Sequence, residues 1–315
     1  MEDLLDRVVH DVSSLVHPRH SALHPAAARA LEPGKLFRPR LTLQVAALLG
    51  LSDAGAAVDA AAAIELLHMS SLVHDDLMDD SPQRRGVPAI HAAVDPATAI
   101  AIGNLLLARG AALAAGLGAE CARVFAGAVE SLWEGQLMET ALNQRYSLDD
   151  HLQYIALKTA ALMAATTELG ALSQGADAEM AGSFRAFGHE IGMAFQLADD
   201  LLDHIGDPAA LGKEVGGDTA RGIVSVGGWY ALRLRGLAHR DVSAALLNAI
   251  SSEDDAVAHA LGAINERLEG ARATLEAFSG AHTVWRAAYE QVSRMLTAGS
   301  PQRRELILQR MDALR

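Results

Sequence analysis

Hydrophobic positions recur at helical spacing along nearly the whole chain, and Ala and Leu supply most of them. Clusters of β-branched residues are few and Pro is scarce, so the residue preferences favour helix throughout. No stretch alternates apolar and polar residues in the manner of a β-strand. The pattern therefore predicts an all-α protein, a single domain over residues 1–315 that is a bundle of roughly ten or more helices.

Helix-start signals divide this pattern into segments. Either Ser52 or Asp53 is placed to cap one helix, and Asp95 and Ser147 are placed to cap two others. Pro96 suits the first helical position after Asp95. The expected helical ranges are 1–30 with breaks at Pro18 and Pro25, 39–49, a helix from 53, 95–115, 120–145, a helix from 147, 177–204, and further helices from 224 to 315 with starts at Ser252 and Ser300. A Gly-rich loop at 206–222 lies before the last group.

Composition excludes some classes of function. The net charge of −13 argues against a nucleic-acid partner. The single Cys121 cannot form an intrachain disulfide and fits a reducing compartment. The first residues are acidic and lack the layout of a signal peptide. We therefore expect a cytoplasmic location.

No transmembrane segment is expected either. A membrane-spanning helix needs about 20 consecutive apolar residues. The range 100–117 comes closest, but Arg109 interrupts it. We therefore interpret this range as a buried helix of a folded domain.

The first candidate site is an acidic motif at the end of an apolar helix. The acids Asp75, Asp76 and Asp79 are followed by the basic pair Arg84-Arg85. Residues three and four apart share a helical face, and carboxylates stacked so closely repel unless a cation lies between them. Oxygen ligands on successive turns suit Mg²⁺, and the arginines suit an anion beside the metal.

The same spacing occurs a second time, which makes a solvated acidic helix end the weaker interpretation. Asp199, Asp200 and Asp203 repeat it on another hydrophobic helix, with Gln196 one turn before Asp200. Two such helices facing each other would hold divalent metal ions around a diphosphate. We treat the pair of motifs as a functional duplication.

Cations stand out at two further places. Lys35, Arg38 and Arg40 precede or begin a helix, which is the electrostatically unfavourable end for them. A solvated basic turn and an anion-binding site both explain that arrangement. Lys158 lies among apolar residues, so it either extends to solvent or meets an anion in a cleft.

Two weaker features remain open. The Gly-rich loop at 206–222 is either an ordinary loop or a cover for a site, to which it would deliver Lys213. Gln136 and Glu139 are polar residues among apolar ones, and a satisfied polar patch in a packed helix is the simpler interpretation of both.

These motifs, taken in order, resemble those of the trans-polyprenyl diphosphate synthases, the all-helical enzymes that elongate isoprenoid chains. The resemblance extends from about Gly34 to Gly222. The matching segments are Gly34-Lys35-x-x-Arg38-Pro39, Glu65-x-x-His68 with Asp75-Asp76-x-x-Asp79 and Arg84-Arg85-Gly86, Lys158-Thr159, Phe195-Gln196-x-x-Asp199-Asp200-x-x-Asp203, and Gly212-Lys213. Each segment alone is a weak signal, whereas the ordered set is specific.

The resemblance implies a role for each matching residue. Mg²⁺ on an allylic diphosphate would be held by Asp75, Asp76, Asp79, Asp199, Asp200 and Asp203. That diphosphate would be contacted by Arg84, Lys158, Thr159, Gln196 and Lys213. Isopentenyl diphosphate would be bound by Lys35, Arg38, His68 and Arg85. The residues expected to matter most for catalysis are Asp75, Asp76, Lys158, Asp199 and Lys213.

The resemblance also implies an isoprenoid synthase-like fold around a central apolar cavity, and a homodimer. Ser70 and Ser71 lie just before the first motif, where members with short products often carry bulky aromatic residues. Small residues there indicate a product of geranylgeranyl length or longer.

Some positions depart from the family pattern. Ile223-Val224-Ser225 replaces the usual Lys-x-Thr after Gly222, and Asn104 stands where many members have Asp. Two alternatives to elongation remain, and the lost lysine motivates the first of them. One is a class I terpene cyclase on the same scaffold, which would need no isopentenyl site. The other is a non-catalytic partner subunit of a prenyl synthase, which would not need the acids.

Overall fold

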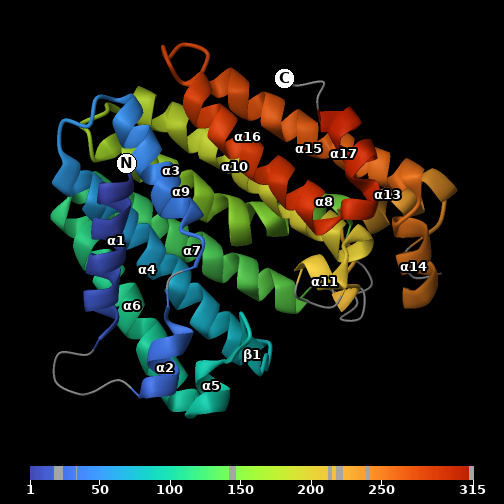
Figure 1. Cartoon of the computed structure of the whole chain (residues 1–315), viewed down its shortest axis with the longest axis horizontal. Coiled ribbons are helices and arrows are strands. Elements are labelled where there is room, and N and C mark those ends of the chain that lie inside the picture. The colour runs from blue at the N-terminus through green and yellow to red at the C-terminus, as the bar shows by residue number, and fades with distance from the viewer. Residues whose placement is uncertain are drawn as a thin grey trace. The chain divides into compact units, whose positions relative to one another are not determined.

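The described residues are almost entirely helical (Figure 1). The structure is a computed structural model that describes residues 1–17, 24–32, 34–141, 147–211, 215–217, 223–238 and 242–311. It confirms the predicted all-α class with ten or more helices.

The N-terminal elements are α1 (Glu2–Val16), α2 (Pro25–Ala30), α3 (Phe37–Leu48), α4 (Ala54–Met78), β1 (Gln83–Arg84), β2 (Val87–Pro88), α5 (Ile90–Ala93), α6 (Pro96–Gly116) and α7 (Ala119–Ala141). The following elements are α8 (Leu148–Ile155), the π-helical turn η1 (Ala156–Ala160), α9 (Ala161–Leu172), α10 (Ala178–Ile205) and α11 (Pro208–Leu211). The C-terminal elements are α13 (Val226–Arg235), α14 (Ala244–Ser251), α15 (Asp254–Thr274), α16 (His282–Gly299), the 3₁₀ turn η3 (Pro301–Arg303) and α17 (Arg304–Met311).

The predicted helix caps at the N-termini of α4, α6 and α8 are confirmed. Asp53, Asp95 and Ser147 each accept a hydrogen bond from a backbone N–H in the first turn of the helix that follows. Ser147 and Asp150 form a reciprocal capping box. Each such cap contributes about 1 kcal/mol to helix stability. These three helices carry or flank the candidate site, so their starting points are well defined.

Other helix starts differ from the prediction. Ser252 ends α14 instead of beginning a helix, and α15 begins after Glu253. Pro39 is not the first residue of its helix, because α3 begins at Phe37 after Leu36. The expectation that no strand is present is also wrong, since β1 and β2 form an antiparallel pair. Strands of two residues are too short to show an alternating pattern.

The described residues form two compact units, which we describe separately. The first comprises Met1–Glu130 and Ala165–Arg185, and the second comprises Ser131–Ala164 and Ala186–Arg315. α7, α9 and α10 each contribute residues to both. The interpretation of residues 1–315 as one domain stays a prediction.

The core of the first unit surrounds α4. Val8 of α1, Leu43 of α3, Leu66 of α4 and Leu106 of α6 belong to one fully buried cluster. α4 is apolar on all sides over most of its length, as expected of a helix enclosed by others. Its C-terminal end carries the first acidic motif, so the packing of α4 fixes the position of that motif.

The core of the second unit includes the helices after the Gly-rich loop. Val224, Leu232 of α13, Leu247 of α14 and Ala256 of α15 are buried together. In α10, Leu201 and its neighbour Leu202 are fully buried beside the second acidic motif. This motif is therefore also attached to a packed helix.

Three helical segments are long and apolar enough, judged by length and composition alone, to cross a membrane. They are α4, α6 and Leu148–Leu172. Within the most apolar stretch of each, 72%, 33% and 67% of the residues, respectively, are buried inside the protein. Core packing accounts for most of the apolar character of the first and third, whereas α6 exposes much of its apolar stretch.

Candidate active site

The first acidic motif occupies the last turn of α4. Asp76 is buried with 5% of its surface exposed, Asp75 is half-buried, and Asp79 is exposed as the C-cap. The C-terminal end of a helix carries partial negative charge, so carboxylates there are electrostatically unfavourable without cations. The motif therefore needs positive charge from side chains or from a metal ion.

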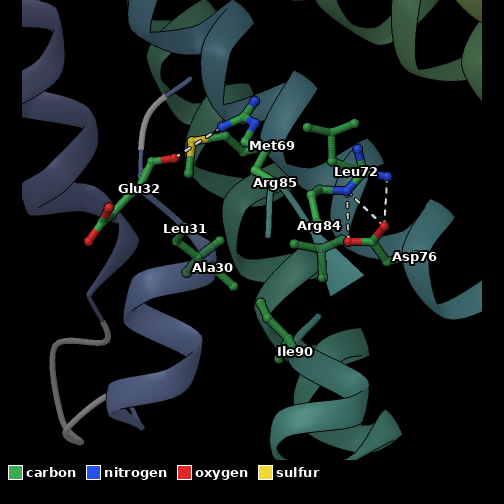
Figure 2. Close-up of a pocket in the computed structure, with 10 residues that line it drawn as sticks. Ala30, Leu31, Glu32, Met69, Leu72, Asp76, Arg84, Arg85 and Ile90 are labelled. Carbon is green, nitrogen blue, oxygen red and sulfur yellow. Dashed lines mark hydrogen bonds and ion pairs between the residues drawn. The ribbon is translucent and has the colours of Figure 1, made fainter. Parts of the chain in front are cut away.

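Arg84 supplies part of that charge. Its Nε donates to Oδ1 and Oδ2 of Asp76 at 2.7 and 2.8 Å, and its terminal nitrogen lies 2.6 Å from Oδ1 (Figure 2). Charge-assisted hydrogen bonds of this kind are the strong ones. Asp76 is thus held by the protein itself, whereas Arg84 keeps further N–H donors for another acceptor.

The β1–β2 hairpin brings the two arginines back to α4. Its loop residues, Arg85 and Gly86, both have positive φ, at 52° and 79°. A two-residue hairpin of the type that matches strand twist requires this conformation at both positions. Gly86 adopts it freely, whereas Arg85 does so at a cost of roughly 1 kcal/mol. The hairpin therefore holds Arg84 and Arg85 at defined places.

Arg85 closes over Gly34. A Cβ atom on Gly34 would lie 2.3 Å from a terminal nitrogen of Arg85, so the missing side chain makes room for the guanidinium. Another terminal nitrogen of Arg85 donates to the carbonyl oxygen of Glu32 at 3.2 Å. Figure 2 shows Arg84 and Arg85 at a cavity of about 20 Å³, whose other walls include Leu31, Met69, Leu72 and Ile90. Guanidinium groups and apolar side chains thus meet at one place.

Arg38, Glu65, His68 and Arg85 form a charged group that we call the arginine cluster. Burial lowers the pKa of His68 well below its usual range, and the positive charges of Arg38, Arg85 and Arg84 add to the effect. Burial raises the pKa of Glu65, against the opposing influence of Arg38 and Arg85. Burial likewise lowers the pKa of Arg38, which Glu65 opposes. A neutral imidazole therefore lies among guanidinium groups that outnumber the one carboxylate.

The arginine cluster is suited to an anion. The Nε atom of Arg38 is buried and has no hydrogen-bond partner in the described part of the chain. A buried donor without an acceptor is costly, and an anionic oxygen would satisfy it. Lys35 and Arg85 are both exposed to solvent, whereas Arg38 and His68 are half-buried.

The second acidic motif, on α10 in the second unit, is surrounded by hydrogen-bond donors. Asp200 is buried, with Oδ2 2.7 Å from Nε2 of His151. The Gln196 amide donates to Asp200 Oδ1 at 2.9 Å and accepts from the Thr159 hydroxyl at 2.8 Å. Asp203 is buried as well. Three of the predicted site residues, Thr159, Gln196 and Asp200, are therefore connected directly.

Lys158 forms an ion pair with Glu139 of α7. The Tyr154 hydroxyl donates to the other carboxylate oxygen of Glu139 at 3.0 Å, and the Lys158 ammonium lies 5.8 Å from the centre of the Tyr154 ring. We call Glu139, Tyr154 and Lys158 the lysine network. Lys158 is thus half-buried and paired, which decides against the alternative of a side chain extending freely to solvent.

Both Lys158 and Thr159 belong to the π-helical turn η1. Single π turns inside α-helices are rare and frequently occur at functional sites. Gly135 of α7 packs against this turn, because a Cβ atom there would lie 2.8 Å from the backbone nitrogen of Lys158. The widened turn and the glycine together bring α7 and η1 into close backbone contact.

Some predicted residues lie outside the described part of the chain. Lys213 and its neighbour Gly212 are among them, so the structure does not test the role predicted for Lys213. Ser225, which stands where the family usually has Thr, is fully buried and bonds to Nε2 of His204. Ile223 places no charge at the usual lysine position.

The metal site also stays a prediction. In the described ranges, no three Asp, Glu, His or Cys side chains lie together as a ready-made metal site. The donor set nevertheless fits Mg²⁺, since every predicted ligand is a carboxylate and oxygen ligands are what this ion prefers. The two acidic motifs belong to different units, each described by itself.

The structure adds residues that sequence reasoning missed. Glu139 is part of the lysine network and not simply an internal patch, and His151 and Tyr154 each contact a site residue. A signal was present: His151 and Tyr154 precede Lys158 by seven and four residues, which places all three on one face of a regular helix. Their aromatic rings lie 6.1 Å apart.

Comparisons with known proteins identify the family of this chain. Residues 20–264 match the family model described as polyprenyl synthetase. The chain is 37% identical over 236 residues to heptaprenyl diphosphate synthase component 2 of Geobacillus stearothermophilus, covering 74% of this chain and 73% of that protein. It is 35% identical over 274 residues to geranylgeranyl diphosphate synthase of Mycobacterium tuberculosis, covering 84% and 74%.

Solved structures give the same result. Heptaprenyl diphosphate synthase from Staphylococcus aureus has a TM-score of 0.82 at 26% identity, covering 94% of this chain and 98% of that one. Polyprenyl synthase from Caulobacter crescentus CB15, complexed with calcium and isoprenyl diphosphate, has a TM-score of 0.82 at 27% identity, covering 95% of each. From its motifs, its helical fold and these matches, the chain belongs to the polyprenyl synthetase family.

Proposed function

We propose that this chain condenses isopentenyl diphosphate with an allylic diphosphate to give a longer all-trans prenyl diphosphate, of geranylgeranyl length or beyond. The observation that carries this proposal is the arginine cluster, whose excess of guanidinium groups and unpartnered Arg38 Nε support a second anion site in addition to the two acidic motifs. An enzyme that joins two diphosphate substrates needs two anion sites. A terpene cyclase acts on one, so the cluster argues against that alternative.

The residues of the first unit would bind and orient isopentenyl diphosphate. The guanidinium groups of Arg38 and Arg85 would bind its phosphate oxygens, and a neutral His68 would donate or accept one hydrogen bond beside them. Glu65 keeps the two guanidinium groups from repelling each other when the site is empty.

The residues around the acidic motifs would bind the allylic diphosphate. Arg84, Lys158, Thr159, Gln196 and Lys213 would contact its oxygens. Positive charge there stabilises the diphosphate as the allylic C–O bond breaks. The isopentenyl double bond then forms the new C–C bond, and the product loses a proton, which the departing diphosphate can accept.

Magnesium is the metal that this site would use. Asp75, Asp76, Asp79, Asp199, Asp200 and Asp203 would hold it, directly or through water. When bound, Mg²⁺ would neutralise charge on the leaving diphosphate. The same reasoning supports other divalent ions, and calcium is present in the crystal structure of the Caulobacter relative.

The residues before the first motif support a long product. Ser70 is buried and donates to the carbonyl oxygen of Gly103 at 2.8 Å, and Ser71 donates to the carbonyl oxygen of His68 at 2.9 Å. Both hydroxyls are therefore bonded to the backbone, and neither side chain is bulky. Replacing Ser71 with Phe should shorten the product, which chain-length analysis would measure.

We also propose a homodimer. α6 has an apolar stretch of which only 33% is buried, and Ile100 within it is 47% exposed. A second copy of this chain is the occupant that we favour for this face, because large exposed apolar patches usually mark association sites. Light scattering after size-exclusion chromatography would test it, and a mass of 33.1 kDa would exclude a dimer. The cytoplasmic location remains a prediction for cell fractionation.

The decisive experiment mixes the protein with Mg²⁺, isopentenyl diphosphate and farnesyl diphosphate. We expect a longer prenyl diphosphate, whose formation stops when a chelator removes the metal. A hydrocarbon or alcohol formed from farnesyl diphosphate alone would instead indicate a cyclase. No product of either kind from the isolated chain would favour a non-catalytic partner subunit.

A further inference from the structure

Glu139 of α7 is the feature of the second unit that the proposed reaction leaves without a role. Its side chain is 14% exposed, and it binds the ammonium group of Lys158, which is 19% exposed. The Tyr154 hydroxyl donates to the remaining carboxylate oxygen at 3.0 Å. A carboxylate with two donors, placed beside a lysine that is expected to bind a diphosphate, suggests a function beyond packing.

The protein holds both the backbone and the ammonium group of Lys158 in place. The backbone of Lys158 belongs to η1 and lies against Gly135, one turn before Glu139 on α7. Its ammonium group lies on the carboxylate of Glu139 and near the Tyr154 ring. A lysine side chain is long and flexible, so holding its charge in one place requires such contacts.

The charges of the pair balance. An ammonium group has three N–H donors, and Glu139 uses one, which leaves others for phosphate oxygens. We propose that Glu139 is a positioning residue, which holds the ammonium group of Lys158 in the orientation that the allylic diphosphate requires. The inference rests on the proposed function, because it assumes that Lys158 binds this diphosphate.

The competing role for this ion pair is to hold α7 against η1. The two roles differ in what a substitution changes. A tie between helices affects stability and leaves substrate affinity alone, whereas a positioning residue affects affinity for one substrate specifically. A change in KM without a change in kcat reports lost binding.

The first experiment compares Glu139→Gln with Glu134→Gln, an exposed glutamate on the same helix. For Glu139→Gln we expect KM for farnesyl diphosphate to rise about tenfold, the size of one charge-assisted contact. KM for isopentenyl diphosphate should change less than about twofold, and kcat less than about threefold. Glu134→Gln should match the wild type, and Glu139→Asp should recover part of the loss. Equal KM values in Glu139→Gln and wild type would overturn the proposal.

Tyr154→Phe provides an intermediate case. It removes the hydroxyl that bonds to Glu139 and keeps the ring near Lys158. We expect KM for farnesyl diphosphate to rise about threefold, because the hydroxyl carries no net charge and holds the carboxylate less strongly than the ammonium group does. A larger effect than that of Glu139→Gln would contradict the assignment of the central role to Glu139.

The second experiment asks whether Glu139 acts through Lys158. Binding of inorganic diphosphate in the presence of Mg²⁺ is measured by calorimetry for wild type, Glu139→Gln, Lys158→Met and the double variant. If Glu139 acts through the lysine, Glu139→Gln weakens diphosphate binding when Lys158 is present and has no further effect when it is combined with Lys158→Met. Additive effects would show that Glu139 acts by itself and would overturn the proposal. This readout needs no turnover, so it separates failure of the inference from failure of the proposed reaction.

Discussion

The two units solve the same electrostatic problem with different side chains. In the first, the buried Asp76 is held by the fixed charge of Arg84. In the second, the buried Asp200 is held by the His151 ring and the Gln196 amide. The acidic motifs have identical spacing, yet Asp76 depends on a guanidinium eight residues away. Asp200 depends on a ring from α8 and on an amide four residues earlier in its own helix. Equal sequence motifs therefore do not imply equal surroundings.

The cationic sites differ in the same way. The arginine cluster has two guanidinium groups and one carboxylate, so it carries excess positive charge before any ligand binds. The lysine network pairs one ammonium with one carboxylate and is neutral. The arginine cluster therefore attracts an anion by its net charge. In the lysine network, Lys158 must either exchange Glu139 for an incoming anion or bind both. This difference predicts which substitutions have large effects.

Arg84→Met should have the largest effect. It leaves Asp76 buried without its cation, and breaking such a pair costs about 2–3 kcal/mol when one partner is partly exposed. Thermal unfolding would measure the loss of stability, and elongation activity should also fall at least tenfold. Arg123→Met, which breaks an exposed pair with Glu120, is the matched control and should cost less than about 1 kcal/mol. Equal costs for the two variants would contradict the special position of Asp76.

Gly135→Ala should come next, because the added Cβ would meet backbone atoms of Lys158 that cannot move alone. Overpacking of this kind costs about 2 kcal/mol. Gly34→Ala is the informative contrast, since its Cβ would meet only the end of the Arg85 side chain. We expect Gly34→Ala to raise KM for isopentenyl diphosphate with little loss of stability. Indistinguishable unfolding midpoints for the two variants would refute the distinction.

His151→Phe should have a smaller effect, about 1–2 kcal/mol, since Asp200 keeps the Gln196 donor. The ring volume is nearly retained, so the cost comes from the lost hydrogen bond. His151→Gln restores a donor and should recover part of the stability in chemical denaturation. If His151→Gln were no more stable than His151→Phe, packing and not hydrogen bonding would explain the pair.

His68 should give the smallest effect, visible only in its pH dependence. Its pKa in the folded protein is lower than in the unfolded chain, because burial and the surrounding arginines disfavour its charged form. The unfolded chain therefore binds more protons below a pH of about 6.5, and stability should fall as the pH decreases through that value. His68→Gln should lack this part of the decrease between neutral and mildly acidic pH. If the free energy of unfolding changed with pH to the same extent in the wild type and in His68→Gln, the neutral imidazole would be contradicted.

Much of this site follows from local sequence signals. The cap at Asp53 begins the helix of the first motif, and the spacing of the acids places both motifs on helices, because these features depend on neighbouring residues. The partners do not follow from local signals. Glu139 and Lys158 are 19 residues apart, and His151 and Asp200 are 49 residues apart, so packing alone brings them together. The π turn also escapes prediction, because one extra residue barely alters a hydrophobic pattern.

The π turn η1 also sets the rotation of the chain on either side of it. One residue corresponds to about 100° around an α-helix. If the same residues from α8 to the start of α9 wound as a regular α-helix without the π turn, His151 and Tyr154 would be turned by about that angle about the helix axis relative to Ala161. The π turn therefore sets the direction in which both rings point, and a regular helix of the same length would keep every helix of the protein while directing the two rings at other neighbours.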